Sequence, residues 1–284
     1  MTQPPTQTVI APDGIKLAFR RLDGVGDLIV AIHGFSGDGL TMLALTEACR
    51  DGRPALLVDV VGHGQSDSPA HLEHYSMTSV VDQVLSVIGP HEPMTVHLLG
   101  YSMGGRIALA MAARAPWYFA SITTLSATPG IEDPVERATR YDKDQERALE
   151  LEAQGMTSFF DAWLDQPLFA SYVASLSPAE LQATKEQRTS GNVQGLSNSL
   201  RGTGTGSMAP VWNSLSSVRS PVLTIAGSLD ERYVAIARRV SEACPLGESE
   251  VIDNAGHVVH HENLPAVATR VTSFLAKCGS DARN

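Results

Sequence analysis

The chain has 284 residues, and its 21 Lys and Arg residues against 31 Asp and Glu residues give a formal net charge of −10 at pH 7. This negative balance argues against a nucleic-acid partner, which would require a basic face. With 43% hydrophobic and 18% charged residues, the composition is that of a globular protein with a sizeable core. The length fits one α/β domain around a single sheet, with an insertion.

The longest apolar stretches, near residues 28–32 and 55–60, have the length of a strand, well below the roughly 20 residues of a membrane helix. We therefore expect no membrane association. Residues 1–8 lack the basic start and apolar block of a secretory signal, so we expect a cytoplasmic protein. The cysteines Cys49, Cys244 and Cys278 are widely spaced, which predicts neither a disulfide framework nor a zinc knuckle.

The chain opens with two β-prone runs, 8–11 and 16–20, around Pro12-Asp13-Gly14, which predicts a hairpin. Short apolar runs then alternate with helical patterns, as in parallel strands joined by crossover helices. Strands are expected at 28–32, 55–59, 95–99, 121–125, 221–226 and 250–252, and helices at 40–49, 79–88, 103–114, 234–243 and 265–277.

This alternation stops between residues 130 and 217, where helical patterns appear at 132–151, 158–163 and 179–188. We predict a helical cap over 130–217 between two parts of the core, 1–129 and 218–284, placed where a lid over an active site would lie. The Gly-rich segment 201–208 follows no strand and lacks the Lys-Ser/Thr of a phosphate loop. We expect it to be a flexible return from the cap to the sheet.

Ser102 lies in Gly100-Tyr101-Ser102-Met103-Gly104, after a predicted strand and before a predicted helix. In that context Gly-x-Ser-x-Gly is the nucleophile elbow. Its glycines are needed because a side chain at position 100 or 104 would collide with the neighbouring backbone. The motif predicts Ser102 as the catalytic serine.

Two partners for Ser102 follow later strands: Asp230 after 222–226, and His257 after the next strand. The order Ser, acid, His is that of the α/β-hydrolase fold. We expect His257 to accept the Ser102 proton and Asp230 to orient His257. Asp230 could instead cap the helix that follows, and Glu231 is a rival acid.

The segment His33-Gly34-Phe35 follows the first long strand and predicts the other half of an oxyanion hole, in which the Phe35 amide pairs with the Met103 amide. We expect His33 to brace this loop, and we also include it among the residues that border the substrate.

No metal or other cofactor is predicted. His257, His260 and His261 form a cluster, but no carboxylate or cysteine completes a ligand set with recognisable spacing.

Several arginines limit the kinds of substrate that the site could bind. Arg106 follows Ser102 by one helical turn, which can place its guanidinium beside the pocket, and Arg140 and Arg188 lie in the predicted cap. Arginines around a serine centre fit a substrate with several carboxylates. Alternatively, these arginines are solvent-exposed charges on a helix surface, since Asp144 lies four residues after Arg140 and exposed pairs of this kind are common.

Longer motifs carry a family resemblance. The chain resembles the 2-succinyl-6-hydroxy-2,4-cyclohexadiene-1-carboxylate synthase family of menaquinone biosynthesis over most of its length. The matching segments are 33–38, 62–64, Gly-Tyr-Ser-Met-Gly-Gly-Arg at 100–106, 129–130, 136–140, Trp163 with Gln-Pro-Leu-Phe-Ala-Ser at 166–171, Arg188, 201–204 and 256–260.

The resemblance implies an α/β-hydrolase fold, a mostly parallel central sheet flanked by helices, with a helical cap inserted between strands. It implies a lyase that eliminates pyruvate from 2-succinyl-5-enolpyruvyl-6-hydroxy-3-cyclohexene-1-carboxylate, with Ser102 as the base. It also implies the triad Ser102, Asp230 and His257, and substrate contacts from Tyr101, Arg106, Arg140, Trp163 and Arg188. We expect a small-molecule polycarboxylate as the partner and a monomer or weak homo-oligomer.

Two other functions stay open on the residues alone. A carboxylesterase or C–C bond hydrolase of the same fold would use Ser102 as a nucleophile or to orient water. A ligand receptor on a hydrolase scaffold would bind without chemistry.

Overall fold

The computed structural model describes residues 3–91 and 95–279, which contain an eight-stranded sheet in the order β1-β2-β4-β3-β5-β6-β7-β8. β1 pairs with β2 and β2 with β4 in antiparallel fashion, and all other neighbours are parallel. This confirms the opening hairpin and the mostly parallel sheet. The strands are β1 (Thr6–Ile10), β2 (Lys16–Leu22), β3 (Leu28–Ile32), β4 (Ala55–Val58), β5 (Val96–Tyr101), β6 (Ser121–Leu125), β7 (Val222–Gly227) and β8 (Gly247–Ile252).

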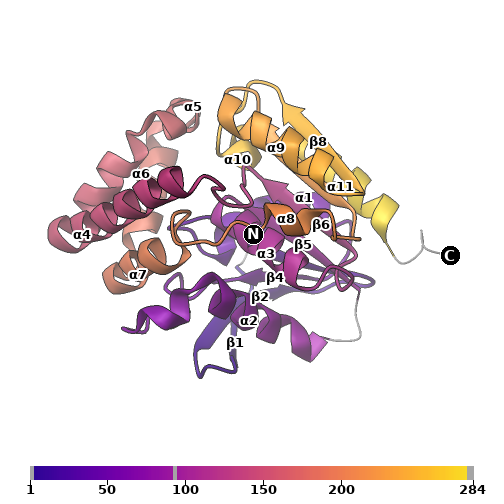
Figure 1. Ribbon diagram of the computed structural model, residues 1–284, viewed down its shortest axis with the longest axis horizontal. Helices are drawn as coiled ribbons and strands as arrows, with labels where there is room; N and C mark the ends of the chain where they lie inside the picture. Colours follow the sequence, from indigo (N-terminus) through magenta and orange to yellow (C-terminus); the bar gives the residue numbers. More distant parts are fainter. Residues whose placement is uncertain (1–2, 92–94, 280–284) are drawn as a thin grey trace.

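Helices cover both faces of the sheet, as an α/β-hydrolase fold requires (Figure 1). α2 (Met77–Ile88), α3 (Met103–Arg114) and α9 (Glu231–Ala243) lie on one face, and α1 (Leu43–Cys49) and α11 (Leu264–Cys278) on the other. Short helical segments are α8 (Trp212–Leu215), α10 (Val259–Glu262) and the 3₁₀ turns Gly39–Met42, Leu72–Tyr75, Gly89–His91 and Pro167–Phe169. Within the described ranges no helix has both the length and the hydropathy to cross a bilayer.

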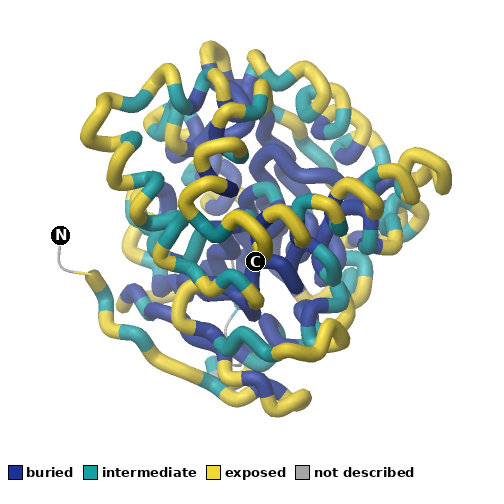
Figure 2. Tube along the Cα trace, turned by 90° about the vertical axis from the view of Figure 1, so that its left-hand side faces the viewer, coloured by how far each residue is buried: buried dark blue, intermediate teal, exposed yellow. Residues whose placement is uncertain are grey.

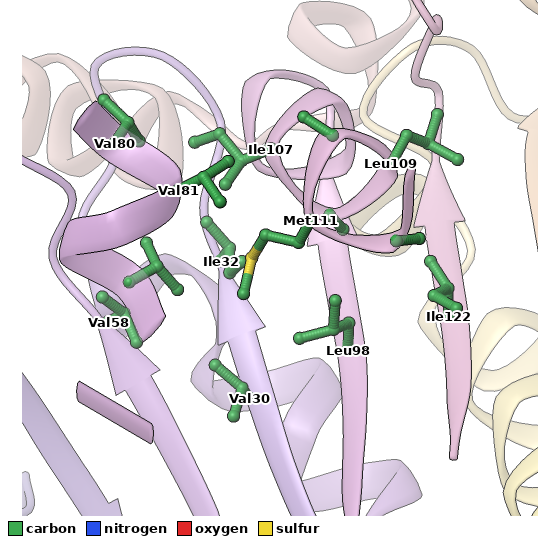
Figure 3. Packing of buried hydrophobic residues seen from close by; sticks show 14 of the residues in the cluster. Val30, Ile32, Val58, Val80, Val81, Leu98, Ile107, Leu109, Met111 and Ile122 are labelled. Atoms are coloured by element: carbon green, nitrogen blue, oxygen red, sulfur yellow. The ribbon is translucent and has the colours of Figure 1, made fainter. Parts of the chain in front are cut away.

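The core follows from the two-residue period of the strands. Val30 and Ile32 of β3 pack toward α2 and α3, whereas Ile29 and Ala31, one position along, pack toward α1 and α11. Figure 3 shows the first of these layers, with Leu98 and Ile122 of the neighbouring strands below α3. Strands buried on both faces need apolar residues at successive positions, which is why the sequence predicted them correctly.

The chain leaves the sheet after β6 and returns at β7, and four of the five α-helices between them stand beside the core in Figure 1. They are α4 (Pro134–Leu164), α5 (Ala170–Ser175), α6 (Pro178–Thr189) and α7 (Val193–Thr203). Gly155, with φ 76°, breaks α4 into two helical segments, where the sequence predicted two. Leu151, Phe160 and Leu196 bury one another in a small separate cluster. Figure 2 shows buried trace in the interior of the molecule and exposed trace around its outside. We refer to α4–α7 as the cap.

The expectation of a flexible return at residues 201–208 is wrong. Its first residues end α7, and the glycines that follow are buried. The Gly206 amide donates a hydrogen bond to Asp144 of α4, and a Cβ atom at position 206 would lie only 2.2 Å from the Tyr141 nitrogen. These glycines therefore allow close packing between backbones. Leu215 of α8 then joins the main core.

Candidate active site

Ser102 occupies a strained turn between β5 and α3, with φ 49° and ψ −105°. A Cβ atom at Gly104 would lie 2.0 Å from the Ile32 carbonyl oxygen, and one at Gly100 would lie 2.4 Å from the Gly104 carbonyl oxygen. Only glycine tolerates such contacts. The elbow thus holds a non-glycine residue in a costly conformation that the surrounding backbone imposes.

Asp230 and His257 meet Ser102 at the carboxyl edge of the sheet. The Ser102 Oγ lies 3.2 Å from the His257 Nε2, and the His257 Nδ1 lies 2.8 Å from the Asp230 Oδ2. His257 is 2% exposed, so solvent cannot replace these contacts. The arrangement supports proton transfer from the serine to an oriented imidazole.

Asp230 also performs the capping role that its position suggested. Its Oδ1 accepts a hydrogen bond from the Tyr233 amide, 3.3 Å away, at the start of α9. Glu231, the rival acid, is the first residue of that helix and is exposed. The geometry therefore favours Asp230 as the partner of His257.

The two residues expected to form the oxyanion hole flank the serine. Phe35 follows β3, Met103 is the first residue of α3, and both line one cavity with Ser102. The Met103 amide belongs to the first turn of a helix, where amides have no intrahelical acceptor. The Phe35 ring contacts Trp163 of the cap, with the ring centroids 5.1 Å apart.

A cavity of about 290 Å³ lies between the elbow and the cap. Its walls combine aromatic rings with positive charge, a combination suited to an organic anion. The predicted site residues on its walls are Phe35, Tyr101, Ser102, Met103, Arg106, Arg140, Trp163, Arg188 and His257, and they are joined by Asp144, Arg147, Gln166, Arg232 and Tyr233 among others.

Arg106 and Arg140 approach the cavity from the core and from the cap. Arg106 is buried and donates to the Thr203 carbonyl oxygen. Burial, and next the charge of Arg140, lower the pKa of Arg106 to about 10. The Arg140 Nε lies 2.8 Å from the Asp144 Oδ1, and Asp144 is fully buried. This pair belongs to the cavity wall and not to a solvated helix face.

Arg188 and Trp163 carry hydrogen-bond donors without acceptors. The Arg188 Nη1 donates to the Ser36 hydroxyl, and burial lowers the pKa of Arg188. Among the residues that the structure describes, the buried Arg188 Nε and Trp163 Nε1 have no acceptor. Unpaired buried donors are costly, and a ligand rich in acceptor oxygens would satisfy them.

The inclusion of His33 among the residues that border the substrate needs correction. His33 is fully buried, outside the cavity lining, and both ring nitrogens are used. Its Nε2 accepts from the Val60 amide at 3.1 Å, which leaves the proton on Nδ1 to donate to the Gly34 carbonyl oxygen at 2.7 Å. Burial lowers the pKa of His33. Its contacts are those of a residue that braces the Phe35 loop.

Sequence reasoning missed Arg147, Arg232 and Tyr233. Arg147 follows Arg140 by seven residues, a helical spacing that returns to the same face and could have revealed it. Arg232 and Tyr233 adjoin Asp230, but nothing in the sequence shows that the first turn of α9 faces the cavity. Within residues 3–91 and 95–279, no group of three or more His, Cys, Asp and Glu side chains could hold a metal ion.

The fold and the elbow agree with the comparisons with known proteins. Residues 27–264 match the family model of the alpha/beta hydrolase fold. The protein therefore belongs to the structural class of α/β hydrolases.

Three relatives narrow the class. The putative 2-succinyl-6-hydroxy-2,4-cyclohexadiene-1-carboxylate synthase of Bacillus subtilis is 32% identical over 95% of this chain and 98% of its own length. The synthase of that name from Salmonella schwarzengrund is 27% identical over 87% and 93%. The solved structure of MenH from S. aureus superposes with a TM-score of 0.86 at 28% identity, over 92% of this chain and 98% of its own. The chain belongs to this synthase family within the α/β hydrolases.

Proposed function

We propose that the chain is a carbon–oxygen lyase that eliminates pyruvate from 2-succinyl-5-enolpyruvyl-6-hydroxy-3-cyclohexene-1-carboxylate in menaquinone biosynthesis. The observation that carries the proposal is the cavity itself, in which an oriented serine–histidine pair faces several arginines. The product appears in the names of the relatives. An ordinary esterase has no need for so many cations, whereas this substrate carries three carboxylates.

The chemistry begins at Ser102. Its Oγ removes the proton α to the succinyl ketone while passing its own proton to the His257 Nε2, 3.2 Å away. Asp230 stabilises the resulting imidazolium. The negative charge that develops on the ketone oxygen is stabilised by the amides of Phe35 and Met103.

The enolate then expels the leaving group. Its electron pair moves into the ring, the existing ring double bond shifts by one position, and the C–O bond to the enolpyruvyl group breaks. The ring gains one double bond, and pyruvate leaves as its enolate. The imidazolium of His257 gives its proton to that enolate, and Ser102 keeps the proton that it took from the substrate, so both side chains are back in their starting state. No acyl-enzyme forms, so a triad of hydrolase type performs an elimination by acid–base catalysis alone.

The roles of the substrate-contacting residues belong to the same proposal. Arg106, Arg140 and Arg188 bind carboxylates through charge-assisted hydrogen bonds. Tyr101 and Trp163 belong to the aromatic part of the wall.

The test is to mix the purified protein with freshly generated enolpyruvyl substrate and to follow pyruvate. We expect release well above the spontaneous rate, and its loss in Ser102→Ala. Release at the spontaneous rate would refute the lyase, and a burst of p-nitrophenol from short-chain esters would point to an acyl-enzyme and thus to an esterase.

A further inference from the structure

One carboxylate serves two arginines on the cap side of the cavity. Arg140, Asp144 and Arg147 lie on one face of α4, within seven residues. The Asp144 Oδ1 lies 2.8 Å from the Arg140 Nε but 4.0 Å from the Arg147 Nη1, and its Oδ2 accepts from the Gly206 amide. Asp144 thus neutralises Arg140 and satisfies a backbone donor, and leaves Arg147 with a weak electrostatic partner only.

Neutral groups hold the Arg147 side chain in place. Its guanidinium lies 5.2 Å from the centre of the Trp163 ring, and its Nη2 donates to the Gln166 Oε1 at 2.9 Å. Gln166 is fixed in turn, because its Nε2 donates to the Trp163 carbonyl oxygen at 3.0 Å. A ring face and an amide orient a guanidinium without neutralising it.

The arrangement has an electrostatic cost. Burial lowers the pKa of Arg147, and the charge of Arg140 lowers it further. The same Arg140 charge acts on Arg106. Arg106, Arg140 and Arg147, three of the five arginines in the described cavity lining, therefore share the one carboxylate of that lining, Asp144. An anion placed among them would relieve their repulsion.

We propose that Arg147 is a further substrate-binding residue, which forms with Arg140 a subsite for one carboxylate of a polycarboxylate ligand. Trp163 and Gln166 pre-orient the planar guanidinium of Arg147, whose parallel N–H donors match a carboxylate. Less side-chain entropy is therefore lost when the carboxylate binds. The subsite favours ligands with several carboxylates over neutral esters. Which carboxylate it takes rests on the proposed function; that it binds a carboxylate rests on the charges and contacts of α4.

The test compares Arg147→Gln and Arg147→Lys with Lys143→Gln. Lys143 lies one turn earlier on α4, is exposed and lies outside the cavity lining, so its variant removes a charge from the same helix without touching the subsite. In the pyruvate assay, we expect Arg147→Gln to raise KM by about ten- to a hundredfold. Loss of one hydrogen bond between charged groups weakens binding by about this factor. Because the contact is made in ground state and transition state alike, kcat should change little.

Arg147→Lys should raise KM less than Arg147→Gln does, because lysine keeps the charge but lacks the paired N–H donors of the guanidinium. Lys143→Gln should have the KM of the wild type. An unchanged KM in Arg147→Gln, a fall in kcat alone, or an equal effect of Lys143→Gln would overturn the subsite. Equal thermal melting of the variants establishes that the fold is intact.

A second measurement is independent of catalysis. Propane-1,2,3-tricarboxylate is titrated into each protein by calorimetry at low ionic strength. We expect it to bind the wild type and Lys143→Gln equally, and Arg147→Gln about tenfold more weakly. If the wild type binds the probe but releases no pyruvate, the lyase proposal fails and the subsite stands. If the probe does not bind, or binds Arg147→Gln equally well, the subsite fails.

Discussion

The molecule contains a second array of serine, histidine and aspartate, at the other end of the sheet. The His97 Nδ1 lies 2.8 Å from the Ser121 Oγ, and the His97 Nε2 lies 3.4 Å from the Asp27 Oδ2. Ser121 begins β6 and faces His97 in regular register, and neither has exposed surface. By contrast, Ser102 sits at the carboxyl end of β5, in a strained turn on the cavity wall.

The three residue types are therefore not what defines a catalytic site. The array around Ser102 adds an unfavourable backbone conformation and a cavity lined by cations. The array around Ser121 has hydrogen bonds within a strand pair, which stabilise the sheet. Three predictions test the difference between the two arrays and one tests a buried histidine near the catalytic end, in order of decreasing expected effect.

Replacement of Ser102 should lower catalysis strongly, and replacement of Ser121 should hardly change it. We expect Ser102→Ala to lower kcat for pyruvate release by about a thousandfold, the usual contribution of a positioned base. Ser121→Ala should leave kcat within about twofold, since it is buried at the far end of the sheet. Steady-state kinetics on both proteins checks this, and a comparable loss in Ser121→Ala would remove the distinction.

Variants at two adjacent residues, Asp230 and Glu231, test which of them is the acid that orients His257. Asp230→Asn should lower kcat by about a hundredfold or more, because the amide no longer fixes the imidazole tautomer. Glu231→Gln, on the exposed adjacent residue, should have no such effect. If Glu231→Gln gave the larger loss in the same assay, the acid would have been assigned to the wrong residue.

The catalytic end of the sheet also contains histidines that stay neutral. Burial, and then the charge of His33, lower the pKa of His63 to about 3. The unfolded chain takes up this proton near pH 6.5 and the folded chain does not, so stability falls as pH decreases from 6.5 toward 3.

Replacing His63 by Gln should therefore flatten the decline of unfolding free energy with falling pH, by up to about 1.4 kcal/mol per pH unit. Denaturant titrations at several pH values measure the slope. An identical slope in wild type and variant would show that folding does not lower the pKa of His63.

The smallest effect is expected on stability at the non-catalytic array. Ser121→Ala removes the hydroxyl that faces the His97 Nδ1 and should reduce the free energy of unfolding by about 1 kcal/mol. Chemical denaturation at pH 7 measures this. A gain in stability would mean that the array is not a stabilising feature.

The sequence predicted the core and the elbow because their constraints are local. Buried parallel strands require apolar runs, and the turn at Ser102 requires glycines at 100 and 104. The order of Ser102, Asp230 and His257 then placed all three at one edge of the sheet. Neither the burial of Asp144 nor the orientation of Arg147 is local. The first depends on how α4 packs against α7 and the following turn, and the second on contacts with Trp163 and Gln166 further along the chain.

Helix α7 shows the same limit. Its sequence contains two glycines and several Ser and Asn residues, which have low helix propensity. Gly195 packs against Gly62, and Gly202 against Tyr75, at distances that leave no space for a Cβ atom. Tertiary packing thus overrides local preference, and a single sequence does not reveal such a helix.

The contacts around Phe35 link the cap to catalysis. Trp163 and Phe160 of α4 rest on the Phe35 ring, and Arg188 of α6 bonds to Ser36, a non-glycine residue at φ 64°. The segment that contains the proposed Phe35 donor is therefore held in place by α4 and α6 of the cap. We therefore expect that removal of the cap would not leave a smaller active enzyme, because the segment next to the serine would lose the contacts that support it.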